Sequence, residues 1–365
     1  MNTTRKVTYI VGTALSVCFS ALVLSAPVAP PVGQLQYPWS TLPEHCKGKL
    51  PVPENCVLED WTTYDESRAK LIMLYAIEQF TLLERALEEI SASTRVLDSG
   101  WPLITVNYSG LYNLSPGGKS FDAEELTRIM RWKKRVPNSH FVHIAEATFW
   151  VRKAWSLRGS GYANTVSDET WKLFNKYHQD AERILMEAPR KLRDYPTWHH
   201  AMISISRNLD SPSRSTEDRF AEASHRWPTY YPFYEITANR IQPKWGSSWR
   251  KLESFASSSA AAMGPDSKEG AGLYARIYIY MRNDEALDIM RPDWEKLKRS
   301  FEALIANQPK APTYRNYYAS FACAMRDKPA FTRAMNLIDK DTLLRDSWIK
   351  GHSHDACVEW AFAKS

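Results

Sequence analysis

The nonapeptide YPTWHHAMI, residues 195–203, decides the predicted fold because its opening recurs three times further along the chain. YPFYEITAN (231–239), GAGLYARIY (270–278) and APTYRNYYA (311–319) also place an aromatic residue two positions after a proline or glycine. The recurring positions 196, 232, 272 and 312 are separated by 36, 40 and 40 residues. A second aromatic residue follows each opening after 15 to 22 residues, at Phe220, Trp249, Trp294 and Phe331.

Each of these units predicts a pair of helices, and three units close on a proline, at Pro228, Pro265 and Pro309. Steps of this length are typical of tetratricopeptide-like arrays, in which each helix pair buries its apolar face against the next. We therefore predict an all-α fold, an α-solenoid of tetratricopeptide-like helix pairs. The longer pair before the repeats, 139–159 and 168–188, resembles a lead-in or capping repeat.

The 365 residues divide into four predicted segments. Residues 1–26 are a signal peptide or membrane anchor, because Arg5 and Lys6 precede an apolar run of 18 residues, 7–24. Residues 27–58 form a proline-rich tether with a disulfide, 59–136 form N-terminal helices with an irregular excursion, and 137–365 form the helical repeat domain. We expect a location in the periplasm or outside the cell, with inner-membrane anchoring as the alternative if the leader is not cut.

The N-terminal helices are predicted from capping and periodicity. Thr63 and Glu66 form a capping box before one helix that continues to residue 90. Turn residues in 97–118 predict the irregular excursion, in which a small hairpin is one alternative. A further helix over 121–135 ends before Pro137, and its terminal cations either complement the helix dipole or attract an acidic partner.

The cysteines outside the leader form one near pair and one distant pair. Cys46 and Cys56 lie close together in the sequence, as do Cys323 and Cys357. In an oxidising compartment we predict the disulfides Cys46–Cys56 and Cys323–Cys357, each stabilising the fold by about 3 to 4 kcal/mol. A metal site is the competing interpretation, but no Cys-x-x-Cys spacing supports it.

Charge and motifs argue against several classes of function. The net charge of +6 is spread over interleaved acidic and basic residues, which is no footprint of a nucleic-acid-binding protein. Gly159 and Gly161 follow a helix and lack the third glycine of a dinucleotide fingerprint, so Gly159 is better explained as a helix end. Two clusters have residue types found in metal sites but no established spacing: His140, His143 and Glu146, and His352, His354 and Asp355. We predict no metal and no cofactor.

Two motifs carry a resemblance to a known family. AWSLRGSGYANTVSDETWKLF (154–174) and QPKWGSSWRKLESFA (242–256) resemble the bacterial family named domain of unknown function 4034, over roughly residues 62–339. The resemblance implies an α-helical, tetratricopeptide-like domain. It carries over no catalytic residue, because none is established for the family.

The leading functional hypothesis is a non-enzymatic, envelope-located protein that binds a protein or peptide partner on the inner surface of a superhelix. Aromatic residues are typical anchors of such surfaces. The candidate binding residues are Arg158, Trp198, His199, Tyr234, Trp245 and Trp249. One alternative is a cell-wall glycan or peptide hydrolase that uses Glu146 or Glu235 in an aromatic-lined cleft. Another is a periplasmic immunity-type or structural protein.

Overall fold

The structure, a computed structural model, describes residues 46, 51–58, 61, 63–112, 114, 123–159, 163–209, 212–282 and 286–363. All of them lie within one compact unit, Gln36–Ser365. The predicted leader and most of the predicted tether lie outside the described residues. Within the described ranges the chain is helical and forms no β-strand, apart from an isolated bridge between Val96 and Pro102, so the all-α prediction is confirmed. None of the helices in these ranges is both long and apolar enough to cross a bilayer.

The first predicted helix is divided into two, α2 (Tyr64–Ala76) and α3 (Phe80–Ala92). Thr63 caps α2 as predicted, because its hydroxyl accepts a hydrogen bond from the Glu66 amide at 3.3 Å. The prediction of one continuous helix is wrong: Glu78, between the two helices, has a φ of +59°. Its carboxylate accepts a hydrogen bond from Arg131 Nε at 2.8 Å, and this contact is 53 residues distant in the sequence.

The basic cluster at the end of α5 (Ala123–Arg135) finds its acidic partners inside the protein. Arg135 lies 2.8 Å from a carboxylate oxygen of Glu78, and Lys133 lies 2.5 Å from Glu146 on the next helix. These pairs hold α5 against its neighbours. The Glu78 carboxylate at the turn between α2 and α3 is thus held by cations of α5.

The predicted irregular excursion contains a short helix. The 3-10 turn η4 (Leu103–Thr105) leads into α4 (Val106–Tyr112), which is a correction to the predicted absence of regular structure. Val106 and Leu111 are buried, and the missing side chain of Gly110 lets α4 approach α2 closely. A Cβ atom at Gly110 would lie 2.7 Å from Leu71 Cδ1. Long-range packing therefore forms this helix.

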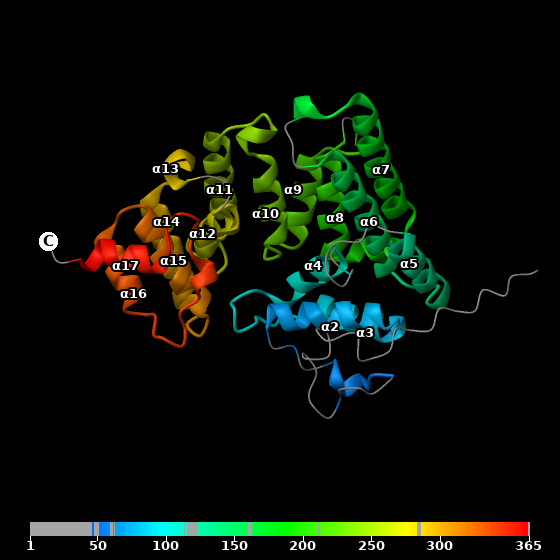
Figure 1. The fold of residues 1–365 in the computed structure, drawn as a ribbon, viewed down its shortest axis with the longest axis horizontal. Coiled ribbons are helices and arrows are strands. Elements are labelled where there is room, and N and C mark those ends of the chain that lie inside the picture. Colours follow the sequence, from blue (N-terminus) through cyan, green and yellow to red (C-terminus); the bar gives the residue numbers. More distant parts are fainter. Residues whose placement is uncertain are drawn as a thin grey trace, which may run out of the picture. The chain divides into compact units, whose positions relative to one another are not determined.

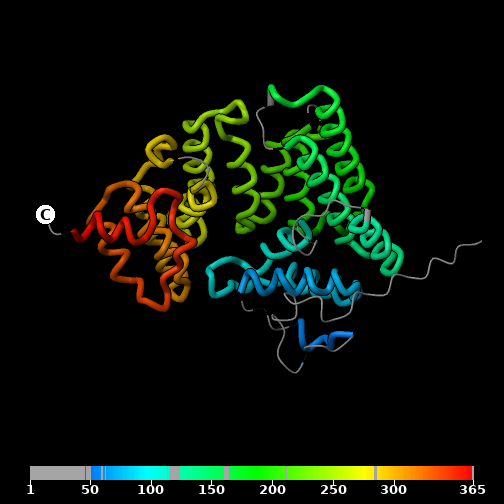
Figure 2. The backbone as a smooth tube through the Cα atoms, viewed as in Figure 1, coloured from blue at the N-terminus to red at the C-terminus, as the bar shows by residue number. Residues whose placement is uncertain are grey.

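The lead-in pair and the four repeats are helix pairs, as predicted. α6 (Phe141–Arg158) packs against α7 (Asp168–Glu187), and Gly159 ends α6 with a φ of +70°. The chain then continues as α8 (Pro196–Ser206) with α9 (Thr216–Arg226), α10 (Pro232–Arg240) with α11 (Trp249–Met263), α12 (Gly270–Met281) with α14 (Trp294–Asn307), and α15 (Pro312–Ala324) with α16 (Lys328–Met335) (Figures 1 and 2).

Short elements connect these pairs. Residues 242–256, the second family motif, form the 3-10 turn η7 (Pro243–Trp245), a left-handed Gly246 and the cap Ser248 of α11, so the motif is a bend between two helices. The remaining elements are η3 (Glu54–Cys56), η5 (Ala163–Thr165), η6 (Arg190–Asp194), α13 (Leu287–Met290), η8 (Arg345–Ser347) and α17 (His354–Phe362).

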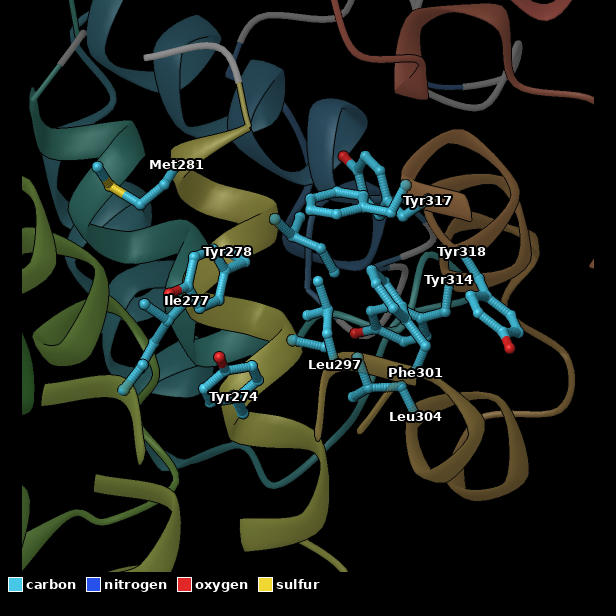
Figure 3. Packing of buried hydrophobic residues seen from close by; sticks show 14 of the residues in the cluster. Tyr274, Ile277, Tyr278, Met281, Leu297, Phe301, Leu304, Tyr314, Tyr317 and Tyr318 are labelled. Atoms are coloured by element: carbon cyan, nitrogen blue, oxygen red, sulfur yellow. The ribbon is translucent and has the colours of Figure 1, made fainter. Parts of the chain in front are cut away.

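The core of the C-terminal half lies between the helices of successive pairs. Figure 3 shows Phe301 and Leu304 of α14 packed together with Tyr314 of α15 and facing α12. Gly272 brings α12 close to α14, because a Cβ atom there would lie 2.5 Å from Leu304 Cδ2. Tyr314, the aromatic residue of the repeat opening, thus serves inter-helix packing. On the same two helices, the stacked rings of Phe301 and Tyr318 lie 5.4 Å apart.

Both predicted disulfides are present. Cys46 pairs with Cys56 across a Cα–Cα distance of 5.9 Å, and Cys323 pairs with Cys357 across 5.8 Å. The second bond joins α15 to α17. Disulfides are typical of proteins that fold in an oxidising compartment, and the two bonds are consistent with such a location.

One backbone carbonyl joins the N-terminal helices to the C-terminal half. The carbonyl oxygen of Gly100, in the loop before α4, accepts hydrogen bonds from Tyr314 Oη at 2.6 Å and Arg276 Nη2 at 3.3 Å. These partners are 214 and 176 residues distant. Gly100 has a φ of +82°, and a Cβ atom there would lie 2.4 Å from the ring of Tyr314. We call this arrangement the Gly100 contact.

The Gly100 contact yields a prediction with a matched control. Gly246 has a similar φ of +80°, but no atom lies within 4 Å of the position that a Cβ atom would take there. Gly246→Ala is therefore expected to lower the free energy of unfolding by roughly 1 kcal/mol, the cost of left-handed backbone alone. Gly100→Ala adds the clash with Tyr314 and is expected to cost about 3 kcal/mol. Chemical denaturation measures both, and equal losses would contradict the close approach at Gly100.

Candidate functional site

A cleft of about 620 Å³ lies where α2 and α4 face the first helices of the repeat pairs. Its walls come from α2, α4, α8, α10, α12, α15 and the loop that carries Ser99 and Trp101. α4, which carries Tyr108, Ser109 and Tyr112 of the wall, packs against α2, α6 and α8. The volume falls within the range of small-ligand sites.

Five tyrosines and one tryptophan line the cleft. The rings belong to Tyr64, Tyr108, Tyr112, Tyr280, Tyr317 and Trp101. Tyr108 meets His200 edge to face with ring centroids 3.7 Å apart, and Tyr112 lies 5.7 Å from Tyr108. Burial raises the pKa of the Tyr108 hydroxyl, so it remains a neutral hydrogen-bonding group at physiological pH. The wall therefore offers ring faces together with hydroxyl groups.

His200 is a neutral member of the cleft. Its side chain is 4% exposed, and burial, followed by the nearby Arg207 cation, lowers its pKa to about 3. Nδ1 has no hydrogen-bond partner within the protein. The imidazole is thus uncharged at any physiological pH.

Glu235, on α10, is the most perturbed acid of the cleft. Burial raises the pKa of its carboxyl group to about 7, and the opposing attraction of Arg276 is smaller. Oε1 is buried without a hydrogen-bond partner within the protein. A carboxyl group in this state is protonated for much of the time near neutral pH, and it can then donate a hydrogen bond or a proton into the cleft.

Two arginines complete the polar part of the wall. Arg207 follows α8 directly, and its Nη1 donates to the Asn239 side-chain oxygen at 3.1 Å and to the Ile236 carbonyl at 3.4 Å. Burial lowers the pKa of Arg207. Arg282 follows α12, and its guanidinium lies 5.0 Å from the ring of Tyr317. Asp65, in the first turn of α2, is the other carboxylate on the wall and is exposed.

The predicted binding residues lie elsewhere, and their role in binding stays a prediction. Trp198 and His199 are buried: Trp198 Nε1 donates to the Leu185 carbonyl at 3.0 Å, and His199 Nε2 lies 3.0 Å from the Arg193 carbonyl. Tyr234 is also buried and packs against Phe220. These contacts stabilise helix packing.

The other three predicted residues are half-buried. Arg158 donates to the Gly159 carbonyl at 3.0 Å and lies over the ring of Trp155. Trp245 meets Trp155 edge to face at 5.9 Å, so the structure brings the two sequence motifs together. Trp245 lines a separate hollow, whereas Trp249 packs against the core.

The alternative residues are distributed as follows. Glu146 is occupied by Lys133, whereas Glu235 lies in the cleft. His354 Nδ1 lies 2.6 Å from Asp355, next to it in the sequence. One group among the described residues has metal-ligand spacing: Cys323, His352 and Cys357, with ligand atoms within 4.8 Å of one another. Because the two sulfur atoms form a disulfide, this group offers only an imidazole.

Most of the cleft was missed at the level of sequence. Tyr108 and Tyr112 lie in the segment predicted to be irregular, and Tyr280 and Tyr317 lie inside predicted core helices. The only signal that could have found them is the pattern of the repeat openings. His200 and Glu235 lie at neighbouring positions of that pattern, on the first helices of two successive repeats. Of the cleft residues, Glu235 alone was named, as a candidate acid.

The comparisons with known proteins give one result. Residues 67–212 match the model of a family described as Domain of unknown function (DUF4034), which confirms the predicted resemblance over this segment. The match includes the first motif, 154–174, and ends before the second, 242–256. It contains Tyr108, His200 and Arg207 of the cleft but not Glu235. No curated protein and no solved structure matches the chain.

The state of Glu235 predicts a pH dependence of stability. Because its pKa is raised from 4.5 to about 7, the folded protein binds more protons than the unfolded chain between these values. Stability is therefore lost as the pH rises through this window. Glu235→Gln removes this loss of stability. The melting temperature of the variant minus that of the parent is therefore expected to be larger at pH 8 than at pH 5.

The difference between variant and parent isolates Glu235 from other groups. Burial lowers the pKa of His178 to about 4, and burial raises that of Glu84 to about 7, but both groups are present in each protein and their contributions cancel. A difference in melting temperature that stays constant from pH 5 to pH 8 would contradict the raised pKa of Glu235.

Proposed function

We propose that this protein binds a protein or peptide partner, one segment of which enters the cleft, and that it does so without catalysing a reaction. The observation that carries this proposal is the convergence of five tyrosines and Trp101 on one cleft. Tyrosine and tryptophan are the commonest anchors of binding sites, because they supply a large contact area together with a polar tip.

The arrangement of the repeats supports the same proposal. The cleft is lined by α8, α10, α12 and α15, the first helices of the four pairs, and α8, α10 and α12 are packed in succession. We infer a solenoid whose inner surface is formed by these helices, which is the surface that repeat proteins use for partners. α2 and α4 cover part of this surface and narrow it to a cleft.

We further propose that the protein acts in the bacterial envelope, in the periplasm or outside the cell. The two disulfides support this location, because such bonds persist in oxidising compartments. The predicted leader supports it as well. The partner would then be an envelope or extracellular polypeptide.

Cross-linking from the cleft tests the binding proposal. Tyr280 lines the cleft and is 38% exposed. A photoreactive amino acid in its place is expected to capture the partner in intact cells. The captured partner is then identified and purified. Tyr280→Ala is expected to weaken the affinity about tenfold, a typical loss for an aromatic anchor, as measured by calorimetry.

The control is Leu173→Ala, since Leu173 has a similar exposure of 42% but lies on α7, outside the cleft lining. The control is expected to bind the partner as the parent protein does. Equal affinities for parent and Tyr280→Ala would show that the partner does not occupy the cleft.

A hydrolase is the second candidate, and the state of Glu235 favours it. A general acid needs a pKa near the working pH, and burial gives Glu235 such a value inside an aromatic cleft of suitable size. Asp65 is the carboxylate on the same wall that would assist it. Glu146, the other predicted acid, forms an ion pair with Lys133 away from the cleft lining.

Incubation with purified peptidoglycan tests this candidate. If the protein is a hydrolase, it releases soluble fragments, Glu235→Gln lowers the rate at least a hundredfold, and Glu146→Gln leaves the rate of the folded protein unchanged. The binding proposal expects no release by any of the three proteins. If the release of soluble fragments depends on Glu235, the function is hydrolysis and the binding proposal is wrong.

A further inference from the structure

We propose that the cleft recognises a peptide through a free carboxylate group, which pairs with the Arg207 guanidinium while the remainder of the peptide contacts the tyrosine rings. This inference rests on the proposed function, because it names the chemical group that enters the same cleft. It is carried by the position of Arg207 and by the charges around it.

Arg207 is a half-buried cation without a carboxylate partner among the described residues. Its Nη1 contacts are a neutral amide oxygen of Asn239 and a backbone carbonyl, and its Nε has no hydrogen-bond partner within the protein. Burial lowers the pKa of its guanidinium, and Tyr108, Tyr112 and Tyr280 line the same cleft. A partly desolvated cation of this kind gains most from an anion that arrives with its ligand.

The acids of the cleft do not supply that anion. Glu235 is protonated for much of the time near neutral pH, since burial raises its pKa to about 7. Asp65 is exposed in the first turn of α2, where the helix dipole and solvent already stabilise its charge. With Arg207 and Arg282 on the wall, the cleft has an excess of positive charge whenever Glu235 is neutral. An anionic ligand matches this balance.

A purely structural role for Arg207 accounts for only part of its setting. A cation at the end of α8 complements the helix dipole, and its hydrogen bonds to Asn239 and Ile236 join α8 to α10. A dipole role would be served equally well by a side chain that points to solvent, and the two joining hydrogen bonds use only Nη1. It does not require Arg207 to line a cleft with tyrosine hydroxyls around it.

The chemistry of the wall favours a carboxylate on a peptide. A guanidinium matches the two oxygens of a planar carboxylate. The neighbouring hydroxyls of Tyr108 and Ser204, and the carboxyl of Glu235 when protonated, are single donors that suit peptide carbonyls. The ring faces of Tyr280 and Tyr317 suit the apolar side chains of the same peptide. A chain terminus is the simplest source of such a group.

The test uses a synthetic pentapeptide library without Asp or Glu, prepared once with free and once with amidated C-termini. Affinity selection on the full-length protein, followed by mass spectrometry, identifies bound peptides, and calorimetry measures the best of them in both forms. The free form is expected to bind at least tenfold more tightly. Arg207→Gln is expected to abolish this preference, and Arg207→Lys to reduce it.

Arg240→Gln is the matched control, because Arg240 is a neighbouring arginine that does not line the cleft. It is expected to keep the preference of the parent protein. If Arg207→Gln fails to fold, Arg282→Gln is used instead and is expected to reduce the preference, because it removes the other cation of the wall. Folding of each variant is checked by circular dichroism and thermal unfolding.

The outcomes separate this inference from the proposed function. Equal binding of free and amidated peptides would overturn the carboxylate inference and leave the cleft as a peptide site. A preference that survives Arg207→Gln would overturn the assignment to Arg207. If no peptide binds in either form, while a cross-linked partner is still bound through Tyr280, the inference fails and the proposed function stands. Failure of both assays would overturn both.

Discussion

The Gly100 contact is the constraint on which the cleft depends. It holds the loop carrying Ser99 and Trp101 against α12 and α15, and this loop forms one wall of the cleft. The contact needs a residue that tolerates a positive φ and has no side chain, because the ring of Tyr314 occupies the space where a Cβ atom would lie. Arg276 completes it from the buried side, with Trp101 5.4 Å from its guanidinium. The fold and the cleft are thus coupled where this loop meets α12 and α15.

The buried arginines of this protein show why Arg207 is unusual. Arg152 is buried against Glu125, and Arg219 lies 3.2 Å from Glu182. Arg276 has no ion pair among the described residues, but the ring of Tyr231 lies 4.1 Å from its guanidinium and stabilises the charge as a cation–π contact. Arg207 has neither a carboxylate nor a stacked ring of this kind in the described part of the chain. Its charge is therefore open to compensation by a ligand.

Sequence reasoning predicted the helix pairs because their signals are local. The aromatic residue after each proline or glycine and the caps Thr63, Ser248 and Ser353 act within a few residues of their positions. The division at Glu78 could not be predicted, because a continuous apolar pattern runs through it and the deciding partners lie on α5. The same limit applies to the cleft, whose walls come from residues as far apart as Tyr64 and Tyr317.

The most conspicuous aromatic residues of the sequence do not line the cleft. Trp198 and Tyr234 attract notice in the sequence, yet large aromatic side chains gain more from burial than from exposure, and both are core residues. Their neighbours on the adjacent helical face, His200 and Glu235, line the cleft instead. On a first helix packed on two sides, only a narrow face remains for a ligand. Which residue occupies that face depends on the rotation of the helix, and a shift of one position exchanges a core residue for a site residue.

The cleft also concentrates polar atoms that the protein itself leaves unsatisfied. Buried side-chain atoms without a hydrogen-bond partner include His200 Nδ1, Glu235 Oε1, Arg207 Nε and Ser99 Oγ, all on residues of the wall. Such atoms lower the free energy of unfolding, because their hydrogen bonds to water are lost without replacement. A packing role alone would favour apolar residues at these positions. Under the proposed function, a ligand in the cleft would complete the hydrogen bonding of these atoms.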